Sequence, residues 1–169
     1  MVSRIEPQPG QESVWDYPRP PALEPVAAEI VVEFGGREIA RTGGAFRVLE
    51  TSHPPVYYLP PEAFAEGTLR PAGGGSFCEW KGQAAYFDIV ADPDAAPPQH
   101  VAEAKAWAYP QPTDRFAAIA GFVALYAGPM DRCTVGGVEV EPQPGGFYGG
   151  WITPDIVGPF KGGPGTWGW

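Results

Sequence analysis

The sequence predicts a mainly β fold, a small folded β-sheet built from hairpins with one or two short helices. Glycine (23) and proline (22) together exceed a quarter of the 169 residues, which favours many turns. Six Trp, seven Tyr and nine Phe exclude the aromatic-poor composition of a disordered chain. Short apolar and β-branched runs alternate with turn signals, a pattern typical of barrels, sandwiches and folded sheets.

The chain length fits one domain, so we expect a loose N-terminal tail over residues 1–13 and a single β-rich domain over residues 14–169. The domain begins with the proline-rich arm VWDYPRPPALEP (14–25). Proline removes donors from a strand ladder, so this arm is not a central strand. We expect it to lie across the surface with Trp15 and Tyr17 tucked in.

Glycine pairs mark hairpins along the chain. Gly35-Gly36 separates the predicted strands 28–34 and 37–42, and Gly136-Gly137 separates 133–135 and 138–140. A further hairpin is predicted from 76–80 and 83–89, around Lys81-Gly82, after a flexible glycine loop at 73–75.

The remaining elements are less uniform. Residues 45–51 and 56–59 are predicted strands, and Pro60–Phe64 can start a short helix because proline is favoured in a first turn. Two segments keep alternatives open: 101–109 is a helical turn or a strand, and 116–126 is a helix or a buried strand. The segment from Pro142 onward is rich in glycine and aromatic residues and is expected to be non-helical.

Charge and motifs exclude several functions. The formal net charge is −9 and no Lys/Arg run exists, which argues against nucleic acid and against anionic membranes as partners. No apolar signal region or membrane span is present, so we expect a cytoplasmic protein. CxxC is absent and only two histidines occur, so we expect no metal and no cofactor. Phosphate-loop and serine-nucleophile motifs are also missing.

The segment RVLETSHPPVYY (47–58) carries the first candidate site. Glu50 and His53 could share a proton in general acid–base catalysis, since histidine titrates near neutrality. Arg47 could bind a carboxylate or phosphate. The structural alternative makes Arg47 and Glu50 ion-pair partners and places His53 in a turn before the prolines.

Other residues could complete a pocket lined by aromatic rings with a few polar groups. Strand alternation places Cys78 and Trp80 on one face. The candidate ligand-binding residues are Arg47, Tyr57, Trp80, Lys81, Tyr86, Trp107 and Trp151. If they form one site, they converge in a single cleft. Lys161, in the glycine-rich C-terminal segment, is a further candidate ligand for an anion.

The same segments carry a family resemblance. VWDYPRPP (14–21), RVLETSHPPVYYLP (47–60), CEWKGQAAYFD (78–88), AWAYPQP (106–112), PQPGGFYGGWITPDIVGPFKG (142–162) and the closing PGTWGW occur in this order. The chain thereby resembles the bacterial domain-of-unknown-function 427 family, also labelled nucleotidyltransferase-like. The resemblance implies a small all-β fold similar to the Mss4-like or β-tent group. Many members of that group bind zinc through paired CxxC motifs, which this sequence lacks. No spaced carboxylates of the kind that hold Mg²⁺ in nucleotidyl transfer are recognisable either.

Three hypotheses follow. The first is a domain with a pocket for a small polar or anionic molecule, which includes an enzyme using Glu50 and His53. The second is a non-catalytic protein-interaction module that uses the proline-rich arm and exposed aromatic residues. The third is a thiol-dependent, reductase-like enzyme using Cys78, with Cys133 as the resolving thiol. We expect a monomer or a weak homo-oligomer.

Overall fold

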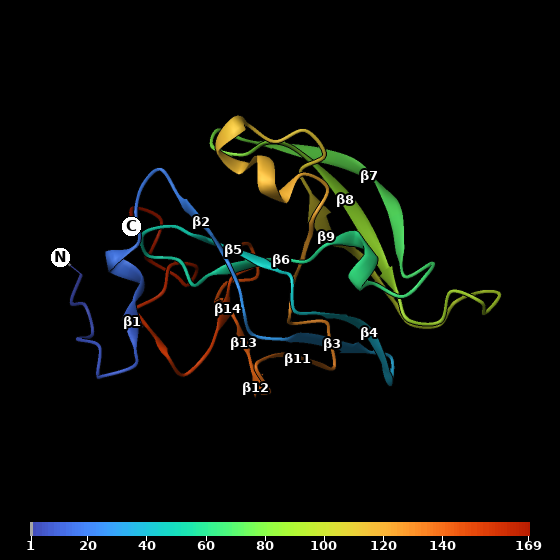
Figure 1. The fold of residues 1–169 in the computed structure, drawn as a ribbon, viewed down its shortest axis with the longest axis horizontal. Helices are drawn as coiled ribbons and strands as arrows, with labels where there is room; N and C mark the ends of the chain where they lie inside the picture. Colours follow the sequence, from blue (N-terminus) through green and yellow to red (C-terminus); the bar gives the residue numbers. More distant parts are fainter. Residues whose placement is uncertain (1) are drawn as a thin grey trace.

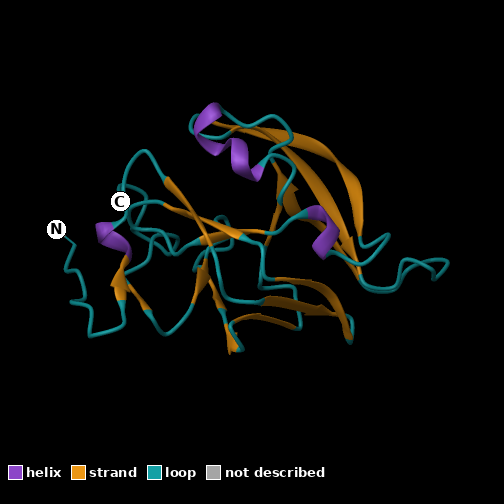
Figure 2. Cartoon of the chain, viewed as in Figure 1, coloured by secondary structure: helices purple, strands orange, loops and turns teal. Residues whose placement is uncertain are grey.

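The computed structural model describes residues 2–169, and its regular elements are almost all strands (Figures 1 and 2). The strands are β1 (Glu12–Ser13), β2 (Ala22–Pro25), β3 (Ile30–Phe34), β4 (Arg37–Thr42), β5 (Phe46–Leu49), β6 (Val56–Tyr58), β7 (Leu69–Cys78), β8 (Gly82–Val90), β9 (Val101–Ala108), β10 (Val123–Leu125), β11 (Arg132–Val135), β12 (Val138–Glu139), β13 (Glu141–Pro142), β14 (Trp151–Ile152) and β15 (Ile156–Val157). The 3-10 helices are η1 (Val14–Asp16), η2 (Pro61–Ala63) and η3 (Asp114–Ile119). The predicted mainly β class is confirmed, while the β-tent grouping stays a prediction.

Two four-stranded antiparallel sheets, β10-β9-β8-β7 and β12-β11-β3-β4, form the body of the molecule. Figure 1 shows β7, β8 and β9 arching over β3, β4 and β11. Ile30 and Val32 of β3, Ile89 of β8 and Leu125 of β10 belong to one buried apolar cluster, so the main core lies between these sheets. We call the sheet β10-β9-β8-β7 the upper sheet. A three-stranded sheet, β2-β5-β6, joins it through a bridge between Leu59 and Val123.

The predicted Gly-Gly hairpins are confirmed. Gly35 and Gly36 have φ of 61° and 75°, values that a two-residue hairpin turn between twisted strands requires. Gly136 and Gly137 form the matching turn between β11 and β12. The predicted hairpin around Lys81 also forms, from longer strands than expected.

The structure corrects the prediction for one segment and resolves the two alternatives left open for two others. The expected glycine loop at 73–75 is wrong: these residues lie inside β7, where a register irregularity between Pro71 and Gly75 absorbs them. Residues 101–108 form strand β9. The segment 116–126 contains the end of η3 and the short strand β10, so each alternative describes one part of it.

The N-terminal segment is attached to the C-terminal one. Residues 12 and 13 of the expected tail form β1, which pairs in parallel with β15. In the arm, β2 is an edge strand, as its prolines require. Tyr17 is buried, and Trp15 donates from its indole nitrogen to the carbonyl oxygen of Pro159 at 2.9 Å. No helix within residues 2–169 is long and apolar enough to cross a membrane.

Candidate functional site

A cavity of about 230 Å³ opens between the upper sheet and the loop 142–150. Its walls come from β9, the segment after β10 and this loop, and they are Lys105, Tyr126, Ala127, Gly128, Pro129, Pro142, Gln143, Gly146, Tyr148, Gly149 and Gly150. Apolar and backbone atoms dominate, with few polar side chains, which is the usual composition of a small-molecule pocket.

The loop 142–150 is held in place at three points. The backbone N–H of Gln143 donates to the carbonyl oxygen of Gly150 at 2.9 Å and closes the base of the loop. The Tyr126 hydroxyl donates to the carbonyl oxygen of Phe147 at 2.9 Å and ties down its tip. Gly149 packs so closely on Trp107 that a Cβ there would lie 2.2 Å from Cη2 of the indole, so only glycine fits.

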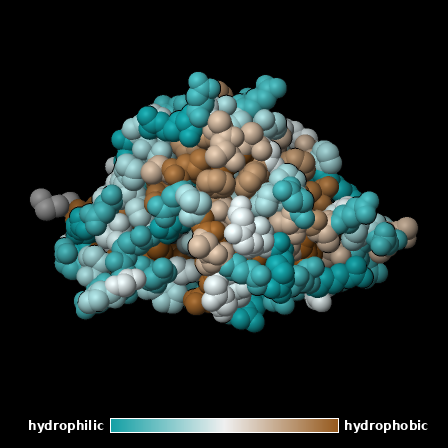
Figure 3. Space-filling model, viewed as in Figure 1, coloured by the Kyte–Doolittle hydropathy of each residue, from teal (hydrophilic) through white to brown (hydrophobic). Residues whose placement is uncertain are grey.

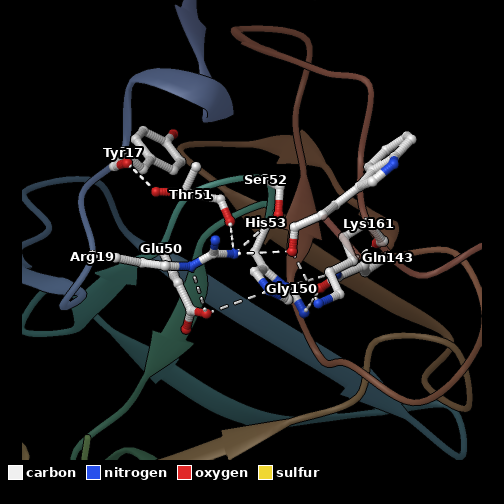
Figure 4. Close-up of polar contacts among 10 residues, drawn as sticks. Tyr17, Arg19, Glu50, Thr51, Ser52, His53, Gln143, Gly150 and Lys161 are labelled. Carbon is white, nitrogen blue, oxygen red and sulfur yellow. Dashed lines mark hydrogen bonds and ion pairs between the residues drawn. The ribbon is translucent and has the colours of Figure 1, made fainter. Parts of the chain in front are cut away.

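Behind the cavity, the buried Gln143 side chain contacts the buried His53 ring (Figure 4). The Gly150 N–H donates to Gln143 Oε1 at 3.0 Å, and Gln143 Nε2 donates to the carbonyl oxygen of Lys161 at 2.8 Å. These two bonds fix the amide orientation, so Nε2 also donates to His53 Nδ1, at 3.1 Å. Nδ1 therefore accepts, and the ring proton of neutral His53 is on Nε2.

His53 Nε2 faces Glu50, whose Oε2 lies 3.6 Å away, a contact longer than a hydrogen bond. Burial, together with the nearby charges of Lys161, Arg19 and Lys81, lowers the pKa of His53 to about 4. At neutral pH the ring is therefore uncharged. The predicted pair of Glu50 and His53 is in contact, while Glu50 also faces the Arg19 guanidinium at 3.7 Å.

The turn that carries this pair has an unusual backbone. Ser52 is fully buried and has φ of 72°, a left-handed conformation that residues with a Cβ rarely adopt. Its N–H donates to the carbonyl oxygen of Val14, and its own carbonyl oxygen accepts from the Lys161 N–H. The arm and the C-terminal segment thus hold the turn between them.

Contacts divide the other candidate residues into separate groups. Arg47 is bound by the carboxylates of Glu12 and Glu24, so its charge is already compensated inside the protein. Tyr57 stacks on Trp151, with ring centroids 5.2 Å apart. These three residues support the sheet of β5 and β6 next to the core.

The remaining candidates lie on or beside the upper sheet. Lys81 lies over the rings of Tyr109 and Phe116, Tyr86 bonds Ser76, and Trp80 packs in a second apolar cluster with Trp107. None of the nine candidate catalytic and ligand-binding residues lines the 230 Å³ cavity. Three of them contact residues of the cavity wall. His53 touches Gln143 and Tyr148, and Trp107 touches Tyr126 and Gly149. Trp151 pairs with Pro142.

Sequence reasoning missed the residues that line the cavity. The wall comes from three separate parts of the chain, at Lys105, at Tyr126 and in the loop 142–150, and none of them belongs to a motif with a known chemical role. The glycine-rich string after Pro142 was the available signal, because glycines next to aromatic residues indicate close packing around a turn.

The two cysteines lie in different apolar clusters. Cys133 is buried in the main core, and burial together with the charge of Glu139 raises its pKa to about 12. A resolving thiol has the opposite properties. Cys78 is half-buried beside Tyr109.

The large exposed apolar side chains belong to several segments of the chain. They are Ile5, Phe77, Val101, Val138, Phe147 and Trp167. On the face in Figure 3, hydrophobic residues gather over the middle of the molecule and hydrophilic ones follow its outline. Within residues 2–169, no group of three or more His, Cys, Asp or Glu side chains is placed to hold a metal ion.

Comparison with known protein families gives one match, to the family described as "Domain of unknown function (DUF427)", over residues 22–136. The matched range covers more than half of the chain. The chain belongs to the DUF427 family. No curated protein matches it. In this DUF427 chain, the cavity is shared between matched residues, such as Lys105 and Tyr126, and the loop 142–150, which follows the matched range.

Proposed function

We propose that this DUF427 domain binds a small polar or anionic molecule in the cavity beneath the loop 142–150. The observation that carries the proposal is the cavity itself, with tyrosine rings, glycine backbone and a lysine in its walls. A cavity of about 150 Å³ holds benzene. The volume of about 230 Å³ therefore fits a compact ligand with one ring.

Charge supports an anionic ligand. The chain has only three lysines, and each lies over a tyrosine ring: Lys81 on Tyr109, Lys105 on Tyr126 and Lys161 on Tyr148. Although acidic residues outnumber basic ones, no lysine forms an ion pair with an Asp or Glu side chain in the described part of the chain. Lys161 Nζ donates to the main-chain oxygen of Trp169 at 3.2 Å. Two of these tyrosines, Tyr126 and Tyr148, line the cavity.

A thermal-shift screen tests this proposal. Purified protein is heated with nucleotides, sugar phosphates, aromatic and aliphatic carboxylates, and neutral compounds of similar size. A molecule that binds only the folded state raises the melting temperature by mass action. We expect hits among the anionic compounds, and we expect Tyr148→Leu to abolish them.

Phe77→Leu is the matched control, because Phe77 is an aromatic residue on β7 that is 74% exposed and outside the cavity. This variant should keep every hit. Hits that survive in Tyr148→Leu, or no hit in the whole panel, would contradict binding at the cavity.

Acid–base chemistry by Glu50 and His53 is a second candidate. It is favoured by the left-handed backbone of Ser52 between them, because backbone strain of this kind clusters at functional sites. Compounds that bind are incubated with the protein and analysed by mass spectrometry, with Glu50→Gln and His53→Asn alongside. Product that forms with the native protein and with neither variant supports catalysis. If the compounds are recovered unchanged from the native protein, the domain binds them without catalysing a reaction.

A further inference from the structure

Strand β9 contains a large bulge that includes Lys105. In the pairing of β8 with β9, Phe87 lies opposite Ala106 and Ile89 lies opposite Ala102. Asp88 alone therefore faces three residues, 103–105. Such irregularities are over-represented next to active sites, where they place side chains that a regular strand does not.

A side chain holds this bulge in shape. The Asp88 carboxylate accepts a hydrogen bond from the backbone N–H of Ala104 at 2.7 Å. Ala104 has φ of 53°, in the left-handed region that disfavours a residue with a Cβ. The backbone carbonyl of Lys105 then accepts from the N–H of Tyr126 at 3.0 Å. Lys105 is thus fixed between the carboxylate-capped bulge on one side and the end of β10 on the other.

This placement puts an uncompensated positive charge at the cavity. Lys105 is part of the wall, and its Nζ lies 5.4 Å from the centroid of the Tyr126 ring, which is also part of the wall. No carboxylate forms an ion pair with it in the residues that the structure describes. The other polar wall groups are neutral: the Gln143 amide, the Tyr126 and Tyr148 hydroxyls and the backbone.

From this geometry we infer that the cavity takes a single-ring carboxylate, whose ring packs against Tyr126 and Tyr148 and whose carboxylate binds Lys105. The inference rests on the proposed function and adds the ligand class and the residue that selects it. Lys105 contacts the ligand, and Asp88 is a positioning residue that acts through the bulge. The cavity has room for one ring and one small acidic group, and lysine supplies the opposite charge.

A matched pair of probes separates shape from charge. Benzoate and benzamide have nearly the same outline, but only benzoate is charged. Each is titrated at low ionic strength into ¹⁵N-labelled protein, and the amide signals of Gly149 and Gly150 report binding at the cavity. We expect benzoate to bind about fivefold more tightly than benzamide, the range of a partly exposed charge pair. Lys105→Met should remove this preference and leave benzamide binding unchanged.

Lys81→Met is the control, because Lys81 also lies on a tyrosine ring but outside the cavity wall. It should keep the benzoate preference. Asp88→Ala should release the bulge and lower the ratio of benzoate affinity to benzamide affinity toward one. Asp88→Asn should restore the ratio, since the amide oxygen still accepts from the N–H of Ala104. A purely structural role for Asp88 would change both affinities equally.

The outcomes distinguish this inference from the proposed function. Equal binding of both probes to the native protein, or a benzoate preference that persists in Lys105→Met, would overturn the inference and leave cavity binding intact. If neither probe binds, the inference also fails. The proposed function fails with it only when the wider thermal-shift panel gives no hit.

Discussion

At the scale of single residues, Gln143 determines what His53 can do. Its amide is oriented by Gly150 and Lys161, and it gives its remaining proton to Nδ1 of the imidazole. A protonated His53 carries a proton on Nδ1 and loses this bond, because two donors then face each other. The low pKa of His53 and the hydrogen bond from Gln143 therefore both favour the neutral ring over the protonated one.

This preference predicts a pH dependence of stability. The pKa of His53 is about 4 in the folded protein and near 6.5 in the unfolded chain. Between these values the unfolded state binds a proton that the folded state does not. Stability is therefore complete above about pH 6.5 and falls as the pH is lowered toward 4, by about 3 kcal/mol in total.

Urea denaturation at several pH values checks this expectation. His53→Asn is the comparison, because its side-chain oxygen can still accept from Gln143 and does not titrate. The difference in unfolding free energy between the two proteins should change across pH 6.5 to 4 and stay flat below it. Parallel curves through this window would show that His53 is not held in its neutral form.

At the scale of elements, the loop 142–150 depends on close backbone contacts. Gly149→Ala puts a methyl group 2.2 Å from the indole of Trp107, whose nitrogen bonds the Tyr58 hydroxyl at 3.3 Å and resists displacement. We expect a loss of about 2 kcal/mol in unfolding free energy, in the range of overpacking, together with loss of ligand binding. Gly43→Ala is the control, since its Cβ meets nothing within 4 Å. Equal stability of both variants would contradict the close packing.

The hairpins show which elements can be predicted from sequence. Gly35-Gly36 and Gly136-Gly137 are recognisable because a two-residue turn needs positive φ at both positions, a purely local requirement. The three glycines at 73–75 look like a loop by the same local rule. They lie inside β7 because β8 pairs with Pro71 before them and with Gly75 at their end, so Gly73 and Gly74 form a bulge within the strand, which only the tertiary structure decides.

In the candidate site too, local contacts could be predicted from the sequence and tertiary contacts could not. Glu50 and His53 are three residues apart, so their contact could be expected from the turn that they share. Gln143 lies 90 residues from His53 and meets it only after the C-terminal segment folds back over the turn at Ser52. The sequence shows no pattern for this meeting, because no periodicity or motif links the two positions.

At the scale of the whole molecule, Trp151 joins the C-terminal segment to the core of the DUF427 range. It is 1% exposed, stacks on Tyr57 of β6 and donates from its indole nitrogen to the carbonyl oxygen of Leu125 in β10 at 3.1 Å. Both partners lie within residues 22–136 and Trp151 lies outside them. The main core is therefore incomplete without the segment that also closes the cavity.

The matched pair Trp151→Leu and Trp167→Leu tests this dependence. Trp151→Leu should lower the unfolding free energy by about 3 kcal/mol, because it leaves a cavity in the core and an unpaired carbonyl at Leu125. Trp167 is 74% exposed, so its replacement should cost almost nothing. Chemical denaturation followed by circular dichroism measures both variants against the native protein.

If the two variants were equally stable, the C-terminal segment would lie on a core that is already complete, and the residues from 142 onward would serve the cavity alone. If only Trp151→Leu is destabilised, core and cavity share one segment, and ligand binding under the loop 142–150 stabilises the whole fold.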